Sequence, residues 1–136
     1  MNKLSRIAMI GCAILFAAFS LSAQAKTEKK EMSGEKTYKG FLADKMCGTG
    51  FTKSGDAQKA AEKAKKHTKD CALEENCKAS GYGLIIGAKF HKFNDAGDKL
   101  ALEYLNKTKK ENNLVVQVKG TMDGDMLNVT SVKDVK

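Results

Sequence analysis

The sequence predicts an α+β fold in which five strands form a small Greek-key barrel. A helical insert is expected after the first strand, and a short helix between the third and fourth. Two observations support this prediction. Stretches with the two-residue apolar alternation of strands are interspersed with stretches of helical periodicity. Turn-forming residues such as Gly48, Gly81 and Gly97 separate these stretches.

The first 25 residues have the three parts of a secretory signal peptide. A short basic segment is followed by an apolar run at residues 7–21 and by the cleavage signature Ala23-Gln24-Ala25. The apolar run is too short for a membrane anchor, and no later stretch is apolar for long enough to span a bilayer. We therefore expect a periplasmic or secreted protein whose mature chain starts near Lys26.

A tether and one domain are expected to follow. Residues 26–36 are mostly lysine, glutamate, serine and glycine, which predicts a flexible, solvated segment before a domain at residues 37–136. Loss of Lys3 and Arg6 with the signal peptide lowers the net charge from +8 to +6, because every acidic residue follows position 25. This balance favours anionic partners, although a solvated lysine surface explains it more readily. Export argues against nucleic acid.

The first strand is expected at residues 37–47, where Tyr38 and Phe41 are apolar and Gly40 permits a bend. Gly48-Thr49-Gly50 is expected to end this strand.

A helical insert at about residues 48–81 is expected next, with its helix at residues 54–78. The helical spacing is carried by Ala57, Ala60, Ala61, Ala64, Thr68 and Cys71. An alanine stripe buries little area per residue, so this helix must lie close against another element.

The rest of the chain predicts mainly sheet. Two paired strands are expected at residues 82–89 and 90–94, followed by a turn that delivers Asp98 as the N-cap of a helix at residues 99–109.

Two strands end the chain, at residues 114–118 and 126–135. The dipeptide Asp123-Gly124 between them is a hairpin signal. Five strands with a helix between the third and fourth is the arrangement of the OB-fold.

Residues 82–132 resemble the bacterial OB-fold (BOF) family of small periplasmic proteins, and residues 114–132 carry the best match. The front half is similar to uncharacterised secreted bacterial proteins that combine a Cys-Gly after the first strand with a downstream histidine and two cysteines. The resemblance implies a periplasmic ligand-binding or stress-related barrel, with no settled chemistry. The helical insert is a departure from a plain BOF barrel.

Four residues with soft or borderline ligand atoms dominate the candidate chemistry: Cys47, His67, Cys71 and Cys77. His67 and Cys71 are four residues apart, so on one helix they would share a face. Cys77 would join them if the chain bends near residues 73–76, and Cys47 would complete a Cys3His site. Zinc takes this set with tetrahedral geometry, whereas Cu(I) would accept the thiolates and the neighbouring Met46.

A disulfide is the competing interpretation. Exported cysteines normally pair, and a bridge from Cys47 to Cys71 or Cys77 would join the insert to the barrel, at a gain of about 2–4 kcal/mol. Cys12 lies in the signal peptide, so three cysteines remain and one would be left over. Thiol redox catalysis is disfavoured because the Cys-x-x-Cys spacing is missing.

A weaker candidate surface lies on the second and third strands. Aromatic and basic side chains there could contact an anionic ligand: Tyr82, Lys89, Phe90, His91 and Lys92.

The sequence therefore favours an exported, non-enzymatic binding module that holds a transition metal, with zinc preferred over copper, in a Cys3His site. The alternative is a disulfide-stapled OB-fold interaction domain whose basic face binds an anionic ligand. No catalytic residues are expected, because no recognisable triad, carboxylate pair or phosphate loop is present in the sequence.

Overall fold

The computed structural model describes residues 34–135. Its five strands are β1 (Lys36–Asp44), β2 (Tyr82–Ile86), β3 (Lys89–Phe93), β4 (Val115–Asp123) and β5 (Met126–Asp134). The predicted signal peptide and most of the predicted tether lie outside the described residues.

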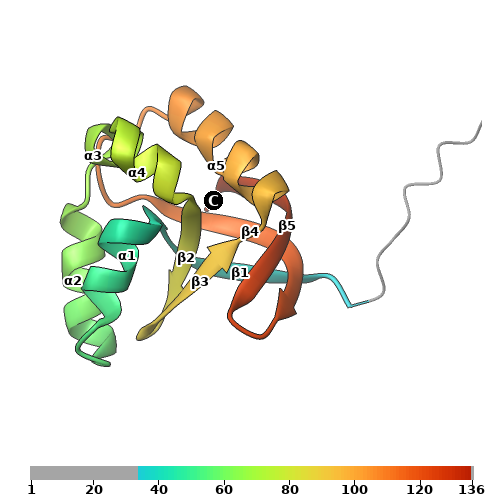
Figure 1. The fold of residues 1–136 in the computed structure, drawn as a ribbon, viewed down its shortest axis with the longest axis horizontal. Coiled ribbons are helices and arrows are strands. Elements are labelled where there is room, and N and C mark those ends of the chain that lie inside the picture. Colours follow the sequence, from blue (N-terminus) through green and yellow to red (C-terminus); the bar gives the residue numbers. More distant parts are fainter. Residues whose placement is uncertain (1–33, 136) are drawn as a thin grey trace, which may run out of the picture. The chain divides into compact units, whose positions relative to one another are not determined.

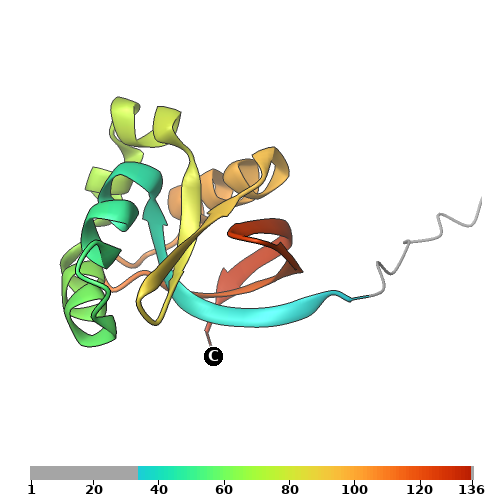
Figure 2. The same cartoon turned by 60° about the horizontal axis from the view of Figure 1, so that its bottom comes forward.

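The five strands close into a ring in the order β1-β2-β3-β5-β4 (Figures 1 and 2). β1 pairs antiparallel with both β2 and β4, and these pair antiparallel with β3 and β5 respectively. A short parallel contact between β3 and β5 completes the ring through Lys92 with Met126 and Phe93 with Leu127. The predicted mixed α+β architecture with five strands is confirmed.

Five helices accompany the sheet: α1 (Lys45–Thr52), α2 (Ala57–Lys66), α3 (Lys69–Leu73), α4 (Glu75–Ser80) and α5 (Asp95–Lys107). The first four form the insert between β1 and β2, and α5 connects β3 to β4, both as predicted. None of the described helices is long and apolar enough to cross a membrane.

The first strand ends earlier than predicted, and Cys47 lies in helix α1 instead. The Asp44 side chain accepts a hydrogen bond from the Cys47 N–H at 2.9 Å, which starts the helix. Gly48 and Gly50 lie inside α1 and do not interrupt the helix. A Cβ atom at Gly48 would lie 2.4 Å from Phe90 Cδ2, so close packing rather than a turn explains that glycine.

The predicted single helix at residues 54–78 is three helices. α2 ends at its C-cap His67, and the Thr68 hydroxyl starts α3 by accepting the Cys71 N–H at 3.2 Å. Glu74 separates α3 from α4, which places a bend in the predicted region.

The start of α5 also differs from the prediction. Asn94 is the N-cap of this helix, and Asp98 lies within its first turn. The Asp98 carboxylate accepts the Tyr82 N–H at 2.7 Å, so this residue ties α5 to the start of β2.

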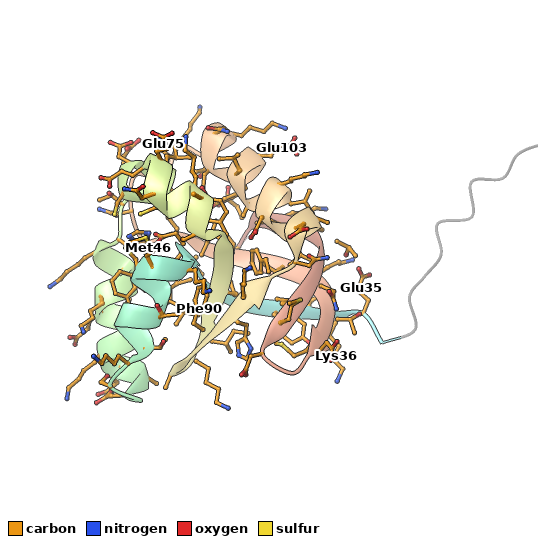
Figure 3. The ribbon with its side chains drawn as sticks, viewed as in Figure 1. Glu35, Lys36, Met46, Glu75, Phe90 and Glu103 are labelled. Atoms are coloured by element: carbon orange, nitrogen blue, oxygen red, sulfur yellow. The ribbon has the colours of Figure 1, made fainter. Side chains whose placement is uncertain are left out.

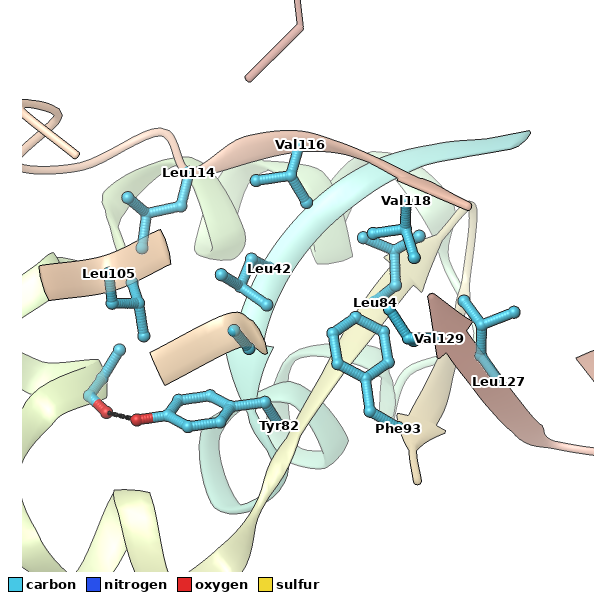
Figure 4. Packing of buried hydrophobic residues seen from close by; sticks show 12 residues of the cluster. Leu42, Tyr82, Leu84, Phe93, Leu105, Leu114, Val116, Val118, Leu127 and Val129 are labelled. Atoms are coloured by element: carbon cyan, nitrogen blue, oxygen red, sulfur yellow. Dashed lines mark hydrogen bonds between the residues drawn. The ribbon is translucent and has the colours of Figure 1, made fainter. Parts of the chain in front are cut away.

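The main core fills the interior of the ring beneath α5 (Figure 4). It consists of aliphatic and aromatic side chains that are almost fully buried: Leu42, Leu84, Phe93, Leu105, Leu114, Val116, Val118, Leu127 and Val129. Tyr82 lies at one end of this core and its hydroxyl donates to the Ala72 carbonyl at 2.9 Å, which attaches α3 to the sheet.

A second, smaller core attaches the insert to the sheet. Ala43 and Ile85 from the strands pack against Ala60 and Ala64 of α2, so the predicted alanine stripe is buried against the sheet. Phe90 and two further aromatic side chains surround this cluster. The two cores together fix the helix termini on which the cysteines lie.

Candidate metal centre

Each of the three cysteines among residues 34–135 is the third residue of a helix. Asp44, Thr68 and Glu74 are the N-caps of α1, α3 and α4, and Cys47, Cys71 and Cys77 follow three residues later. In α1 and α3 the cap side chain accepts the N–H of the cysteine itself. The hydrogen bond that starts the helix therefore also fixes the backbone of the cysteine.

The three thiols meet at one point. The Sγ atoms of Cys47, Cys71 and Cys77 all lie within 4.8 Å of one another, and all three are free thiols. Cys77 is buried, with 6% of its surface exposed, whereas Cys47 and Cys71 are half-buried. Three separate helices thus contribute one sulfur each to a single cluster.

A second group of donors overlaps the first at Cys47. Ligand atoms of Asp44, Cys47 and His67 also lie within 4.8 Å of one another. His67 Nε2 lies 3.1 Å from Asp44 Oδ2, and both residues are buried, with 5% and 0% of their surfaces exposed. Within the described residues neither of these two atoms has a partner with hydrogen-bond geometry.

The carboxylate and the thiols affect one another. Burial raises the pKa of Asp44, but the adjacent His67 and the Cys47 N–H outweigh it and hold that pKa below 3.8. Burial and the charge of Asp44 raise the pKa of Cys47 to about 12 and that of Cys77 to about 11. In the metal-free protein these two thiols are therefore protonated at neutral pH and are poor nucleophiles.

One side of the cluster faces solvent through a shallow hollow of about 460 Å³. Its lining includes Cys47, His67 and Cys71 together with Lys63 and Lys66. An ion could enter from this side. The two lysines bring positive charge close to the thiols and the Asp44 carboxylate.

The donor set and its spacing fit a transition metal. Zinc–sulfur bonds of about 2.3 Å in a tetrahedron place two sulfurs roughly 3.8 Å apart, within reach of a cluster whose Sγ atoms lie inside 4.8 Å. His67 Nε2 lies 3.1 Å from Asp44 Oδ2, so an ion held by His67 would bind at the other ring nitrogen, Nδ1, while Nε2 keeps its proton toward the carboxylate.

The four predicted ligands do not form one group of this kind. They divide between two groups that share Cys47, and His67 belongs with Asp44 rather than with Cys71 and Cys77. The shared helix face expected for His67 and Cys71 is absent, because the chain leaves helix α2 at His67.

Sequence reasoning missed Asp44. The available signal was a repeated spacing, Asp44-x-x-Cys47, Thr68-x-x-Cys71 and Glu74-x-x-Cys77, in which a helix-capping residue precedes each cysteine by three positions. Met46, the predicted soft neighbour, is 59% exposed (Figure 3).

The weaker predicted surface is divided between the two faces of the sheet. Tyr82 is 2% exposed and belongs to the main core, whereas Phe90 lies on the other face against α1. Lys89 is exposed and Lys92 is half-buried. His91 is also half-buried, and burial lowers its pKa. Tyr82 and Phe90 therefore cannot form one stacking surface.

Neither the family models, nor the curated proteins, nor the solved structures contain a match to this chain. The proposals below rest on the geometry.

Proposed function

We propose that this chain is an exported metal-binding module. In this proposal Cys47, Cys71 and Cys77 hold a transition ion as thiolates, His67 is the fourth ligand, and Asp44 positions the imidazole. The observation that carries the proposal is the meeting of three sulfurs, from three helices, beside a buried histidine–carboxylate pair.

Zinc is the ion that we propose. It accepts mixed thiolate and imidazole ligands in a closed tetrahedron, and a carboxylate beside a ligating histidine is the usual second partner of that ring. Three thiolates and a neutral imidazole leave zinc with a net charge of about −1. Lys63 and Lys66, on the same hollow, would offset this charge. Cu(I) is the competing ion, because it accepts three thiolates alone.

The raised pKa values of Cys47 and Cys77 argue against a catalytic role for these thiols. A redox or nucleophilic cysteine needs a thiolate near neutral pH, and these two thiols are shifted in the opposite direction. A metal ion would displace the protons and hold the sulfurs as ligands.

We further propose that the five-stranded ring is an OB-like Greek-key barrel, related to the BOF family. The strand order, the parallel contact between β3 and β5 and the position of α5 between β3 and β4 support this assignment. The insert of helices α1–α4 then adds a metal centre at one side of an otherwise plain barrel.

The deciding experiment is native mass spectrometry, with elemental analysis, of protein purified from the periplasm without reductant or chelator. We expect one zinc ion per chain, three reduced thiols and a mature N-terminus near Lys26. A mass that is two hydrogens light and has no metal would instead indicate a disulfide and the alternative function, a stapled domain that binds an anionic ligand. Copper in place of zinc would support the same metal site but identify its ion as copper.

A further inference from the structure

A second hollow lies away from the cysteines, between β1 and α2, and has a volume of about 450 Å³. Small-molecule sites occupy roughly 300–1,000 Å³, so this volume is sufficient for a small ligand. We propose that this hollow binds a free medium-chain carboxylate. The proposal does not depend on the metal centre.

The hollow exists because small residues line it. Ala57 and Ala61 are one turn apart on α2 and face it, while Ala60 and Ala64 of the same helix pack against the sheet. On the strand side Gly40 contributes backbone alone to the lining, since a Cβ atom there would point toward the main core, 2.9 Å from Leu84 Cγ.

The interior of the hollow is apolar. Phe41, Ile85 and Val115 line it together with the two alanines. Phe41 and Val115 are half-buried and so retain apolar surface that a ligand could cover. Burial of aliphatic carbon against such a surface is favourable by about 0.8 kcal/mol per methylene, which corresponds to roughly fourfold in affinity. This favours a ligand with a hydrocarbon chain.

The charged residues that line the hollow are all basic. Lys39 and Lys65 lie there, none of the lining residues is acidic, and neither lysine forms an ion pair within residues 34–135. Asn113, also in the lining, adds an amide donor. An anionic group complements this charge, and an ammonium group opposes it. A chain with one carboxylate satisfies both the apolar interior and the basic residues.

The test is isothermal titration of the full-length mature protein, as purified, with octanoate, decanoate, decanol and decylamine. We expect decanoate to bind more tightly than octanoate by roughly fourfold to fifteenfold, the range for two methylenes that are half to fully buried. Decanol should bind more weakly than decanoate, and decylamine more weakly still. Equal binding of decylamine and decanoate would overturn the proposal, as would binding only to vesicles of anionic lipid.

Three variants locate the site. Lys39→Gln and Lys65→Gln should each weaken decanoate binding by roughly twofold to fivefold without affecting decanol. Ala61→Leu fills the hollow from a half-buried position on α2 and should weaken both ligands more than tenfold. Lys119→Gln is the matched control, because it removes the same charge from an exposed position on β4 and should change nothing. Undiminished decanoate binding by a folded Ala61→Leu variant would exclude this hollow.

Discussion

His67 Nε2 and Asp44 Oδ2 lie 3.1 Å apart in the interior, yet neither atom has a hydrogen-bond partner among residues 34–135. Buried polar atoms without partners are costly, at about 1–3 kcal/mol each, and are rare in native proteins. The pair sits against Cys47, which also belongs to the three-thiol cluster. An ion bound to the other ring nitrogen, Nδ1, would hold the imidazole so that Nε2–H donates to Asp44 and this cost is removed, which is why the pair is central to the proposed site.

The first prediction concerns Asp44→Asn. Asparagine caps a helix as well as aspartate does, so α1 should be retained, while the negative charge beside His67 is lost. We expect zinc affinity to fall by roughly 10- to 100-fold, the usual effect of a change in a partner of a metal ligand. Competition with a chromophoric chelator would measure it.

Asp44→Ala separates capping from metal binding. It should lose the same zinc affinity and, in addition, about 1 kcal/mol of stability in the metal-free protein, because the Cys47 N–H loses its acceptor. Urea unfolding in the presence of a chelator would detect the difference. Equal zinc affinity in wild-type protein and both variants would remove Asp44 from the site.

The second prediction concerns Cys71→Ser. Cys71 is half-buried and belongs to neither hydrophobic core, so its replacement should leave the metal-free fold intact. Zinc at about 100 times its Kd stabilises a protein by roughly 2.7 kcal/mol, which for a domain of this size raises the Tm by roughly 10–20 °C. This metal-dependent rise should disappear in the variant.

Thermal unfolding with and without a chelator would test Cys71→Ser directly. Ser131→Ala is a suitable control, because Ser131 lies on β5, which carries no cysteine. A chelator effect that persists in Cys71→Ser would place the ion elsewhere.

The third prediction follows from the thiol pKa values. Because burial and Asp44 raise the pKa of Cys47 to about 12 and of Cys77 to about 11, both thiols carry protons at pH 7 that a metal must displace. Zinc affinity should therefore increase with pH, by about 100-fold per unit if two protons are released and more if Cys71 releases a third.

Chelator competition between pH 6.5 and 8 would give the slope, and titration calorimetry in buffers of different ionisation enthalpy would count the protons. The sign is fixed because protons and zinc compete for the same sulfurs. A pH-independent affinity over this range would show that the thiols are not ligands.

The sequence predicted the elements that depend on local patterns. The Asp123-Gly124 signal correctly locates the hairpin between β4 and β5, whose two turn residues are Gly124, at φ +59°, and Asp125. The predicted bend before Cys77 is present at Glu74. These features depend on a few neighbouring residues, so a sequence pattern is sufficient to locate them.

Features set by tertiary contacts escaped prediction. The Gly48-Thr49-Gly50 sequence predicts a break in secondary structure, yet these residues are helical because Asp44 caps α1. Residue 48 is a glycine because Phe90 occupies the space that a side chain there would need. Asp44 lies inside the strand predicted at residues 37–47, and only the approach of His67 from α2 identifies it as part of the site. Contacts between distant segments are not encoded in local spacing.

The last prediction tests this packing at Gly48. The Phe90 ring lies between two glycines, since Cβ atoms built at Gly48 and at Gly83 would each come within 2.4 Å of it. The ring therefore has little room to move away from a new methyl group. Gly48→Ala should cost about 1–3 kcal/mol through overpacking, despite the better helix propensity of alanine.

Gly50→Ala in the same helix is the matched control. A Cβ atom at Gly50 would meet nothing within 4 Å, so alanine there should stabilise the metal-free protein by about 0.5–1 kcal/mol. Since α1 carries Cys47, Gly48→Ala should also weaken zinc binding, whereas Gly50→Ala should leave it unchanged or strengthen it. Denaturant unfolding and zinc competition would measure the changes in stability and in zinc affinity. If Phe90 positions α1, the two variants should change these quantities in opposite directions; if helix propensity alone controls the stability of α1, both should change them in the same direction.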